Sequence, residues 1–182
     1  PYELYGLGLP DLDLMKRTSL ATGKDRSATR AWEQANIHAA RLGDAALAQK
    51  LNLSKMDNGP YRFPAFWPAT IDWAPDHNWG GSGMVGMQEM LMQTHASLEE
   101  RRSGKPGKIR LLPAWPKEWN VDFKLHAPGQ TIVEGKVRSG RMTFLKVTPK
   151  ERQDDVILMN ARVANEAQQE SSRGRDPRAA QE

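Results

Sequence analysis

The sequence predicts an α+β protein in which helices come first and antiparallel β-structure follows. Apolar residues recur at steps of three and four through much of the first hundred positions, as in helices that bury one face. From about residue 108 onward apolar and polar residues alternate instead, and Ser139-Gly140 forms a turn between two alternating stretches. With 182 residues, the chain is long enough for one ordinary domain or for a small helical part joined to a small β part.

Three helical stretches are expected, after an apolar but irregular lead-in over residues 1–23. The first begins at Ser27 and ends at Gly43, a residue that commonly terminates helices. Asp44 caps a short second helix, "AALAQKLNL", so that the two form a helical hairpin. The third runs from Gly83 to about Leu98, and its wide apolar surface predicts burial on most sides.

A proline-rich segment over residues 52–81 separates the second helix from the third. Its prolines prevent any long helix, while its many aromatic residues argue against disorder. A segment of this length without regular structure is typically either functional or disordered, so we expect it to be functional.

The predicted strands follow a polar loop at residues 99–108 and lie in "KIRLLPAW", "TIVEGKV", "MTFLKV" and "DVILM". The tail from about Ala164 contains almost no large apolar residue and is predicted to be disordered. The expected domains are therefore a helical part over residues 1–103, an antiparallel β part over 104–163 and a tail over 164–182.

Composition disfavours several classes of protein and site. Lys and Arg number 26 against 22 Asp and Glu, and the basic residues are scattered, so we expect no nucleic-acid partner. The chain has no cysteine, which excludes disulfides and thiolate metal sites. No apolar run approaches the roughly 20 residues of a membrane helix, and no signal peptide opens the chain. Because the chain begins directly in apolar sequence at Pro1, we expect it to be part of a longer protein.

The densest group of candidate functional residues is "DWAPDHNWGGSGM", residues 72–84. Asp76 follows Pro75, which restricts the local backbone and suits a carboxylate that must be held in one geometry. The glycines that follow would let a substrate approach the main chain. An equally supported alternative is that Asp76 caps a turn or the helix expected to begin near Ser82.

The remaining candidates are histidines, tryptophans and one glutamate. His77 could act as an acid, base or metal ligand, but no second ligand lies at a suitable spacing, so neither a metal nor another cofactor is expected. Trp67, Trp73 and Trp79 could stack on sugars or pack in the core. His38 and His95 lie on predicted helices, where packing is the expected role, and Glu89 is expected to form a salt bridge rather than face a site.

Three stretches together resemble the C-terminal end of the catalytic region of family 95 glycoside hydrolases, the α-fucosidase-type enzymes. They are "WEQANIHAARLGDAALAQKL", "DHNWGGSGMVGMQEMLMQTH" and "IRLLPAWPKEW", and they occur in the family's order between about residues 24 and 120. In the family an Asp-Gly-Asn-Phe-Gly element precedes a helix that ends in a Leu-Leu-Gln-Ser-His-like stretch, and an "LLPALP" strand follows. Here Asp76, His77, Asn78, Trp79 and Gly80 correspond to that element, and His77 and Trp79 depart from it.

The resemblance implies a fold and an activity. The helices would be the last ones of an (α/α)₆ barrel, and the β part would be a small antiparallel sandwich after it. Asp76 would be the general base of an inverting hydrolysis of a plant or algal polysaccharide, with His77, Asn78, Trp79, Trp73 and Trp67 contacting the sugar. The general acid would belong to a preceding part of the same protein, and such a hydrolase would be secreted or periplasmic.

Two alternatives remain open at this stage. The chain could be a non-catalytic carbohydrate-binding or structural module that uses its tryptophans and β face. It could also be a truncated product without a function of its own, and alone it is expected to be inactive.

Overall fold

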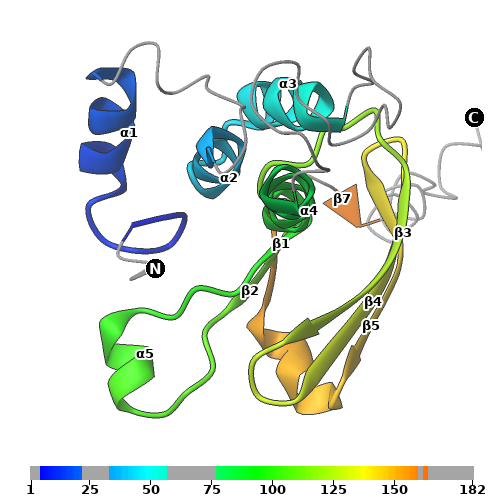
Figure 1. Ribbon diagram of the computed structural model, residues 1–182. Helices are drawn as coiled ribbons and strands as arrows, with labels where there is room; N and C mark the ends of the chain where they lie inside the picture. Colours follow the sequence, from blue (N-terminus) through cyan, green and yellow to red (C-terminus); the bar gives the residue numbers. More distant parts are fainter. Residues whose placement is uncertain (1–4, 22–32, 57–76, 160–161, 164–182) are drawn as a thin grey trace, which may run out of the picture. The chain divides into compact units, whose positions relative to one another are not determined.

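The computed structural model describes residues 5–21, 33–56, 77–159 and 162–163, which fall into two compact units (Figure 1). The first unit comprises Pro1–Pro116 and Asp154–Asn160, and the second comprises Lys117–Gln153 and Ala161–Glu182. Helices dominate the first part of the chain and strands the second, so the predicted α+β class is confirmed. The predicted disordered tail lies outside the described residues, and the domain boundaries stay a prediction.

The lead-in contains a helix that the sequence analysis missed. Helix α1 spans Leu12–Ala21 and has no buried residue. Leu14 and Leu20 are among its exposed apolar side chains. The sequence analysis treated the whole lead-in as irregular because Gly6, Gly8 and Pro10 interrupt its apolar residues.

Helices α2 (Ala35–Arg41) and α3 (Ala45–Met56) form the predicted hairpin. The first helix is shorter than expected, since Glu33 and Gln34 are not helical and residues 27–32 lie outside the described part. Gly43 ends the hairpin's first arm with a φ of +76°, a conformation that favours glycine. The amide of Leu47 donates to Oδ1 of Asp44 at 3.1 Å, so the predicted cap is confirmed.

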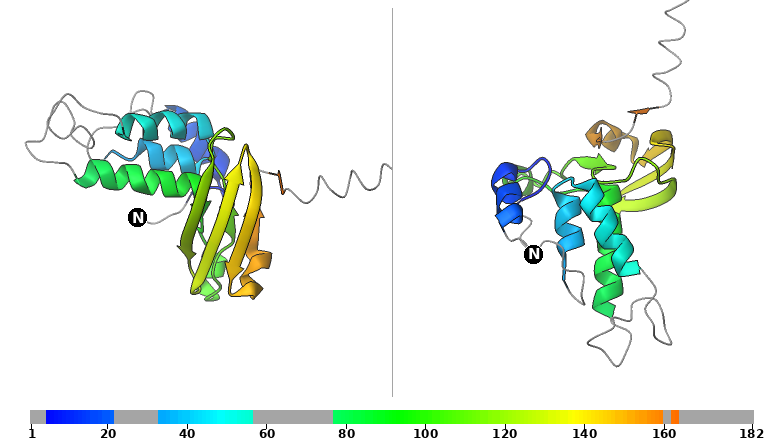
Figure 2. Two further views of the ribbon diagram at one scale, coloured as in Figure 1. Left: turned by 90° about the vertical axis from the view of Figure 1, so that its right-hand side faces the viewer. Right: turned by 90° about the horizontal axis from the view of Figure 1, so that it is seen from above.

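Helix α4 spans His77–Leu91 and packs against both α2 and α3 (Figure 2). It starts before the predicted Gly83 and stops well short of Leu98, because Met92 and Gln93 leave the helix to pair as a strand. The expected burial on most sides is wrong for its first half, where Met84 is 67% and Val85 46% exposed. Met90 and Leu91, near its end, are buried.

Polar side chains, rather than apolar ones alone, join the three helices. Nδ2 of Asn36 donates to Oδ1 of Asn52 at 3.1 Å and to the carbonyl of Ser82 at 2.7 Å. Nδ2 of Asn52 contacts the sulfur of Met90 at 3.0 Å. Both asparagines are fully buried, and Gly86 of α4 lies directly against them. Only a residue without a side chain allows the helix to approach this closely.

A three-stranded sheet completes the first unit, in the order β1 (Met92–Gln93), β2 (Ile109–Leu111) and β6 (Val156–Leu158). Between β1 and β2 the chain forms the short helix α5, Leu98–Arg102, with a capping box between Ser97 and Glu100. The strand predicted in "DVILM" is confirmed, but it pairs parallel to β2 and not antiparallel. The β1–β2 pair is antiparallel.

A four-stranded sheet forms the second unit, in the order β3 (Val121–Ala127), β4 (Thr131–Arg138), β5 (Arg141–Thr148) and β7 (Arg162–Val163). The predicted hairpin of β4 and β5 is confirmed, with positive φ at Ser139 and Gly140 in its turn. Strand β3 was not among the strands predicted. A short 3₁₀ helix, Lys150–Asp155, follows β5.

The contact at Gly86 predicts a sharp difference between two glycines of α4. A Cβ added at Gly86 would lie 2.6 Å from Oδ1 of Asn52 and closer still to Asn36, whereas one added at Gly81 meets nothing within 4 Å. We expect Gly86→Ala to lower the free energy of unfolding by about 2–3 kcal/mol, because it forces α4 away from the asparagines. Gly81→Ala should raise it by about 0.5–1 kcal/mol through helix propensity. Urea unfolding of both variants measures the difference, and equal effects would contradict the packing described.

Candidate functional site

The structure describes only part of the predicted sugar-binding site. Asp76, Trp73 and Trp67 lie outside the described residues. His77, Asn78 and Trp79 form the first turn of α4, and only their backbone is described. The roles assigned to these six residues therefore stay predictions.

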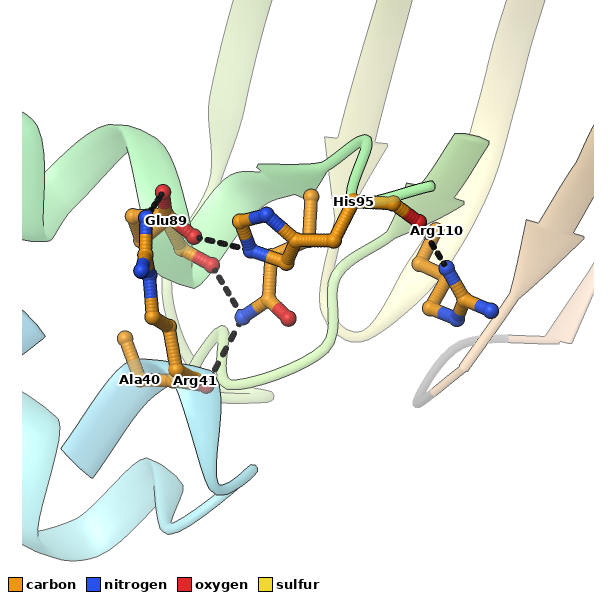
Figure 3. A network of polar contacts seen from close by, with 6 residues as sticks. Ala40, Arg41, Glu89, His95 and Arg110 are labelled. Atoms are coloured by element: carbon orange, nitrogen blue, oxygen red, sulfur yellow. Dashed lines mark hydrogen bonds and ion pairs between the residues drawn. The ribbon is translucent and has the colours of Figure 1, made fainter. Parts of the chain in front are cut away.

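A network of polar side chains lies at the other end of α4, where it meets α2 and the first sheet (Figure 3). Oε1 of Glu89 accepts from Nη2 of Arg41 at 3.1 Å, and Oε2 lies 3.1 Å from Nε2 of His95. The side chains of Glu89 and His95 are only 14% and 5% exposed. The salt bridge predicted for Glu89 is thus confirmed, with two partners that come from different elements.

Gln93 of β1 extends this network to the ends of both helices. Its Nε2 donates to the carbonyl of Ala40 at 2.8 Å and to that of Glu89 at 2.9 Å. The last carbonyls of a helix have no partner within the helix. The buried side-chain amide of Gln93 therefore donates hydrogen bonds to carbonyls near the ends of both α2 and α4. Strand β1 is thereby attached to both helices.

Arg110 of β2 lies beside His95, on the side away from Glu89 (Figure 3). Its Nη1 donates to the backbone carbonyl of His95 at 3.4 Å. The guanidinium also covers Gly8, where any Cβ would collide with it. Burial lowers the pKa of Arg110, while the charge of Glu100 opposes that change.

The electrostatics of Glu89 decide what it can do chemically. Burial by itself raises the pKa of a carboxyl group. The hydrogen bond and charge of His95, together with those of Arg41, outweigh that effect, so the pKa of Glu89 lies below its usual value. The carboxylate is ionised at neutral pH and has no proton to donate, so it suits a structural role and not that of a general acid.

Two predictions about histidines need correction. His95 is not helical but lies in the loop between β1 and α5, although its expected packing role is confirmed by its burial. His38 is on α2, as expected, but it is exposed, so the packing role assigned to it is wrong. It occupies the solvent side of a short helix whose opposite side is buried.

The sequence analysis assigned no functional role to Arg41, Gln93 or Arg110. A signal for them was present, because each lies within one of the three stretches that carry the resemblance, "AARLGD", "QTH" and "IRLLPAW". What could not be read from the sequence is that these stretches meet at one place.

The comparisons assign this chain to no family. No family model matches the sequence, and no curated protein matches it significantly. Among the residues described, no group of three or more His, Asp or Glu side chains could hold a metal ion. None of the described helices has the length and apolar character needed to cross a membrane.

The position of Glu89 predicts a pH-dependent contribution to stability. Since folding lowers its pKa, the stabilisation is present above the unfolded pKa of about 4.3 and is lost as the pH falls through the folded value. We expect Glu89→Gln to lower the free energy of unfolding by about 1.5–3 kcal/mol at pH 7, because Arg41 and His95 lose a charged partner. The deficit should shrink below about pH 4, as measured by urea unfolding across pH.

The matched control is Glu99→Gln, which removes an exposed carboxylate from α5. It should change stability at pH 7 by no more than about 0.5 kcal/mol. A Glu89→Gln deficit that stays constant with pH would contradict the assigned charge state.

Proposed function

We propose that the chain is the C-terminal part of a glycoside hydrolase and that Asp76 is its general base. In this proposal α2, α3 and α4 are the last helices of an (α/α)₆ barrel, and the four-stranded sheet of the second unit belongs to a β-sandwich after it. The proposal depends on the resemblance, and one structural observation supports it. The three stretches that carry the resemblance converge through Arg41, Glu89, His95 and Arg110, although up to about seventy residues separate them.

The start of α4 supports the choice of Asp76. The helix begins at His77, the next residue in the chain. A helix N-terminus carries a partial positive charge, which favours an ionised carboxylate near it. A general base must be ionised to accept a proton from water, so a carboxylate at this point of the sequence suits the role.

The proposed reaction is an inverting hydrolysis of a glycosidic bond. Asp76 removes a proton from water as the water oxygen attacks the anomeric carbon, and a general acid protonates the leaving oxygen. The two carboxyl groups of inverting enzymes are about 6.5–9.5 Å apart, which leaves room for the water. His77, Asn78, Trp79, Trp73 and Trp67 contact the sugar in this proposal, and no cofactor takes part.

The general acid belongs to a preceding part of the same protein. A general acid needs a raised pKa at its working pH. The shifted carboxyl groups among the described residues, Glu89 and Glu100, both have lowered pKa values. In this proposal the chain supplies the base half of the site, and its partner is the N-terminal part of the protein. Export to the periplasm or the medium fits a polysaccharide substrate.

A non-catalytic glycan-binding module is the second candidate. The observation that favours it is the same one, that Glu89 and Glu100, the described carboxyl groups with a shifted pKa, both have lowered values. In such a module the tryptophans of residues 67–79 would bind the sugar and Asp76 would act only as a helix cap.

Replacing Asp76 tests the proposed function. In the protein extended upstream through the complete barrel, we expect Asp76→Asn to lower the kcat for aryl glycosides and plant oligosaccharides about 10²–10⁴-fold, because an amide cannot accept the proton. Glycan binding, measured by calorimetry, should be largely kept.

Asp72→Asn is the matched control, since it removes a carboxylate from the same stretch. It should leave kcat within about threefold of the unmodified protein. Unchanged turnover in Asp76→Asn would show that another residue is the base. Glycan binding without any turnover in the unmodified protein would favour the binding module.

A further inference from the structure

The outward face of the four-stranded sheet carries an ordered set of charges. Directly paired residues of neighbouring strands share a face, so the register arranges these side chains in rows across the sheet. One row holds Asp122, Lys136 and Phe144, and the next holds Lys124, Glu134 and Lys146. Arg138 and Arg141 form a further pair at the hairpin end.

Each acidic residue of this face is shared by two basic ones. Glu134 lies 3.9 Å from Lys124 and 3.7 Å from Lys146. Asp122 contacts both Lys136 and Arg138. These side chains are 31–61% exposed, and exposed pairs of this kind add little to stability. The arrangement therefore contributes only a small stabilisation to the sheet.

The face has a surplus of positive charge and one exposed aromatic ring. Five basic residues, Lys124, Lys136, Lys146, Arg138 and Arg141, accompany two acidic ones, Asp122 and Glu134, on the paired strands. Phe144 is 44% exposed and stands directly across from Lys136. An exposed ring offers apolar surface to the C–H face of a sugar, while the surrounding ammonium and guanidinium groups attract anions.

We propose that this face binds an acidic polysaccharide chain. The lysines and arginines would bind its carboxylate or sulfate groups, and Phe144 would contact a sugar ring between them. Rows of side chains on one face repeat about every 6.8 Å along the strands, and neighbouring strands lie about 4.8 Å apart. The lysine and arginine side chains are therefore spaced for a polymer with separated charges and not for a single small anion. That the polyanion is a glycan rests on the proposed function.

The acidic residues favour a polysaccharide over a nucleic acid. Duplex DNA carries one charge per about 1.7 Å, and proteins that bind it present basic surfaces along the phosphates. Here Asp122 and Glu134 lie among the basic residues and would repel so dense a backbone. A sparsely charged polymer can place its anions at the basic residues and its neutral parts at the carboxylates.

Binding of polygalacturonate, an acidic polysaccharide, to the full chain tests the proposal. We expect saturable binding by calorimetry that weakens when NaCl is raised from about 30 to 300 mM, because exposed charges are screened. Lys124→Gln with Lys146→Gln should weaken binding by about five- to 25-fold, since two exposed lysines that each contribute up to about a fivefold change in affinity together contribute up to about 25-fold. Phe144→Ala should weaken it without changing its salt dependence.

The matched control removes two basic residues from the first unit, Arg102→Gln with Lys105→Gln. It should leave binding unchanged, and thermal unfolding of each variant verifies that it is folded. An equal loss in the control would overturn the assignment to this face. If polygalacturonate does not bind to the unmodified chain, the proposal is also overturned. Tighter binding of a mixed-sequence oligonucleotide than of polygalacturonate would overturn it too.

This proposal and the proposed function fail in different ways. In the protein extended upstream, the double lysine variant should hydrolyse neutral aryl glycosides as fast as the unmodified protein. Polygalacturonate binding without any glycoside turnover would overturn the hydrolase assignment and leave the binding face supported. Glycoside turnover without polygalacturonate binding would overturn the proposed binding face and leave the hydrolase assignment supported.

Discussion

The carboxylate of Glu89 is the constraint on which the first unit depends. It lies where α4 ends, and its two oxygens contact Arg41 from the end of α2 and His95 from the loop after β1. Gln93 adds hydrogen bonds to carbonyls near the ends of both helices, so one cluster of polar side chains connects α2, α4 and the first sheet. Truncating one member of such a network leaves other buried polar groups without partners, which is why its charge state affects the whole unit.

The sequence predicted those parts of the fold that depend on local chemistry. Gly43 and Asp44 determine the joint of the helical hairpin through a positive φ and a cap, and both effects involve only a few neighbouring residues. The β4–β5 hairpin likewise follows from alternation and its turn. The end of α4 could not be predicted in this way, because Met92 and Gln93 leave the helix to pair with residues of β2. Asn36 and Asn52 are polar residues in a core, where a periodicity argument expects apolar ones.

In the candidate site, too, some features could be predicted from local sequence and others depend on tertiary contacts. The expected salt bridge of Glu89 reflects a general tendency of carboxylates on helices, and the structure adds which partners it has. The convergence of Arg41, His95 and Arg110 depends on tertiary packing, which no single stretch encodes. For Asp76 and the tryptophans of residues 67–79, the resemblance supplies the hypothesis, and their roles stay predictions. The basic face of the second sheet was not predicted, since its residues are scattered in sequence and become neighbours only through strand register.

The parallel pairing of β2 with β6 has a consequence for how the chain folds. Strands β3, β4 and β5 all lie between these two partners in the sequence, so the whole of that hairpin system forms one crossover connection within the first sheet. Pairing over so long a separation requires a large loop to close before the contact contributes to stability, and contacts of this kind slow folding. During synthesis, the first sheet cannot acquire its third strand until residues 156–158 have left the ribosome. Until then, the edge of β2 that later pairs with β6 has no strand partner. The packing of α2, α3 and α4 must stabilise the unit during that time.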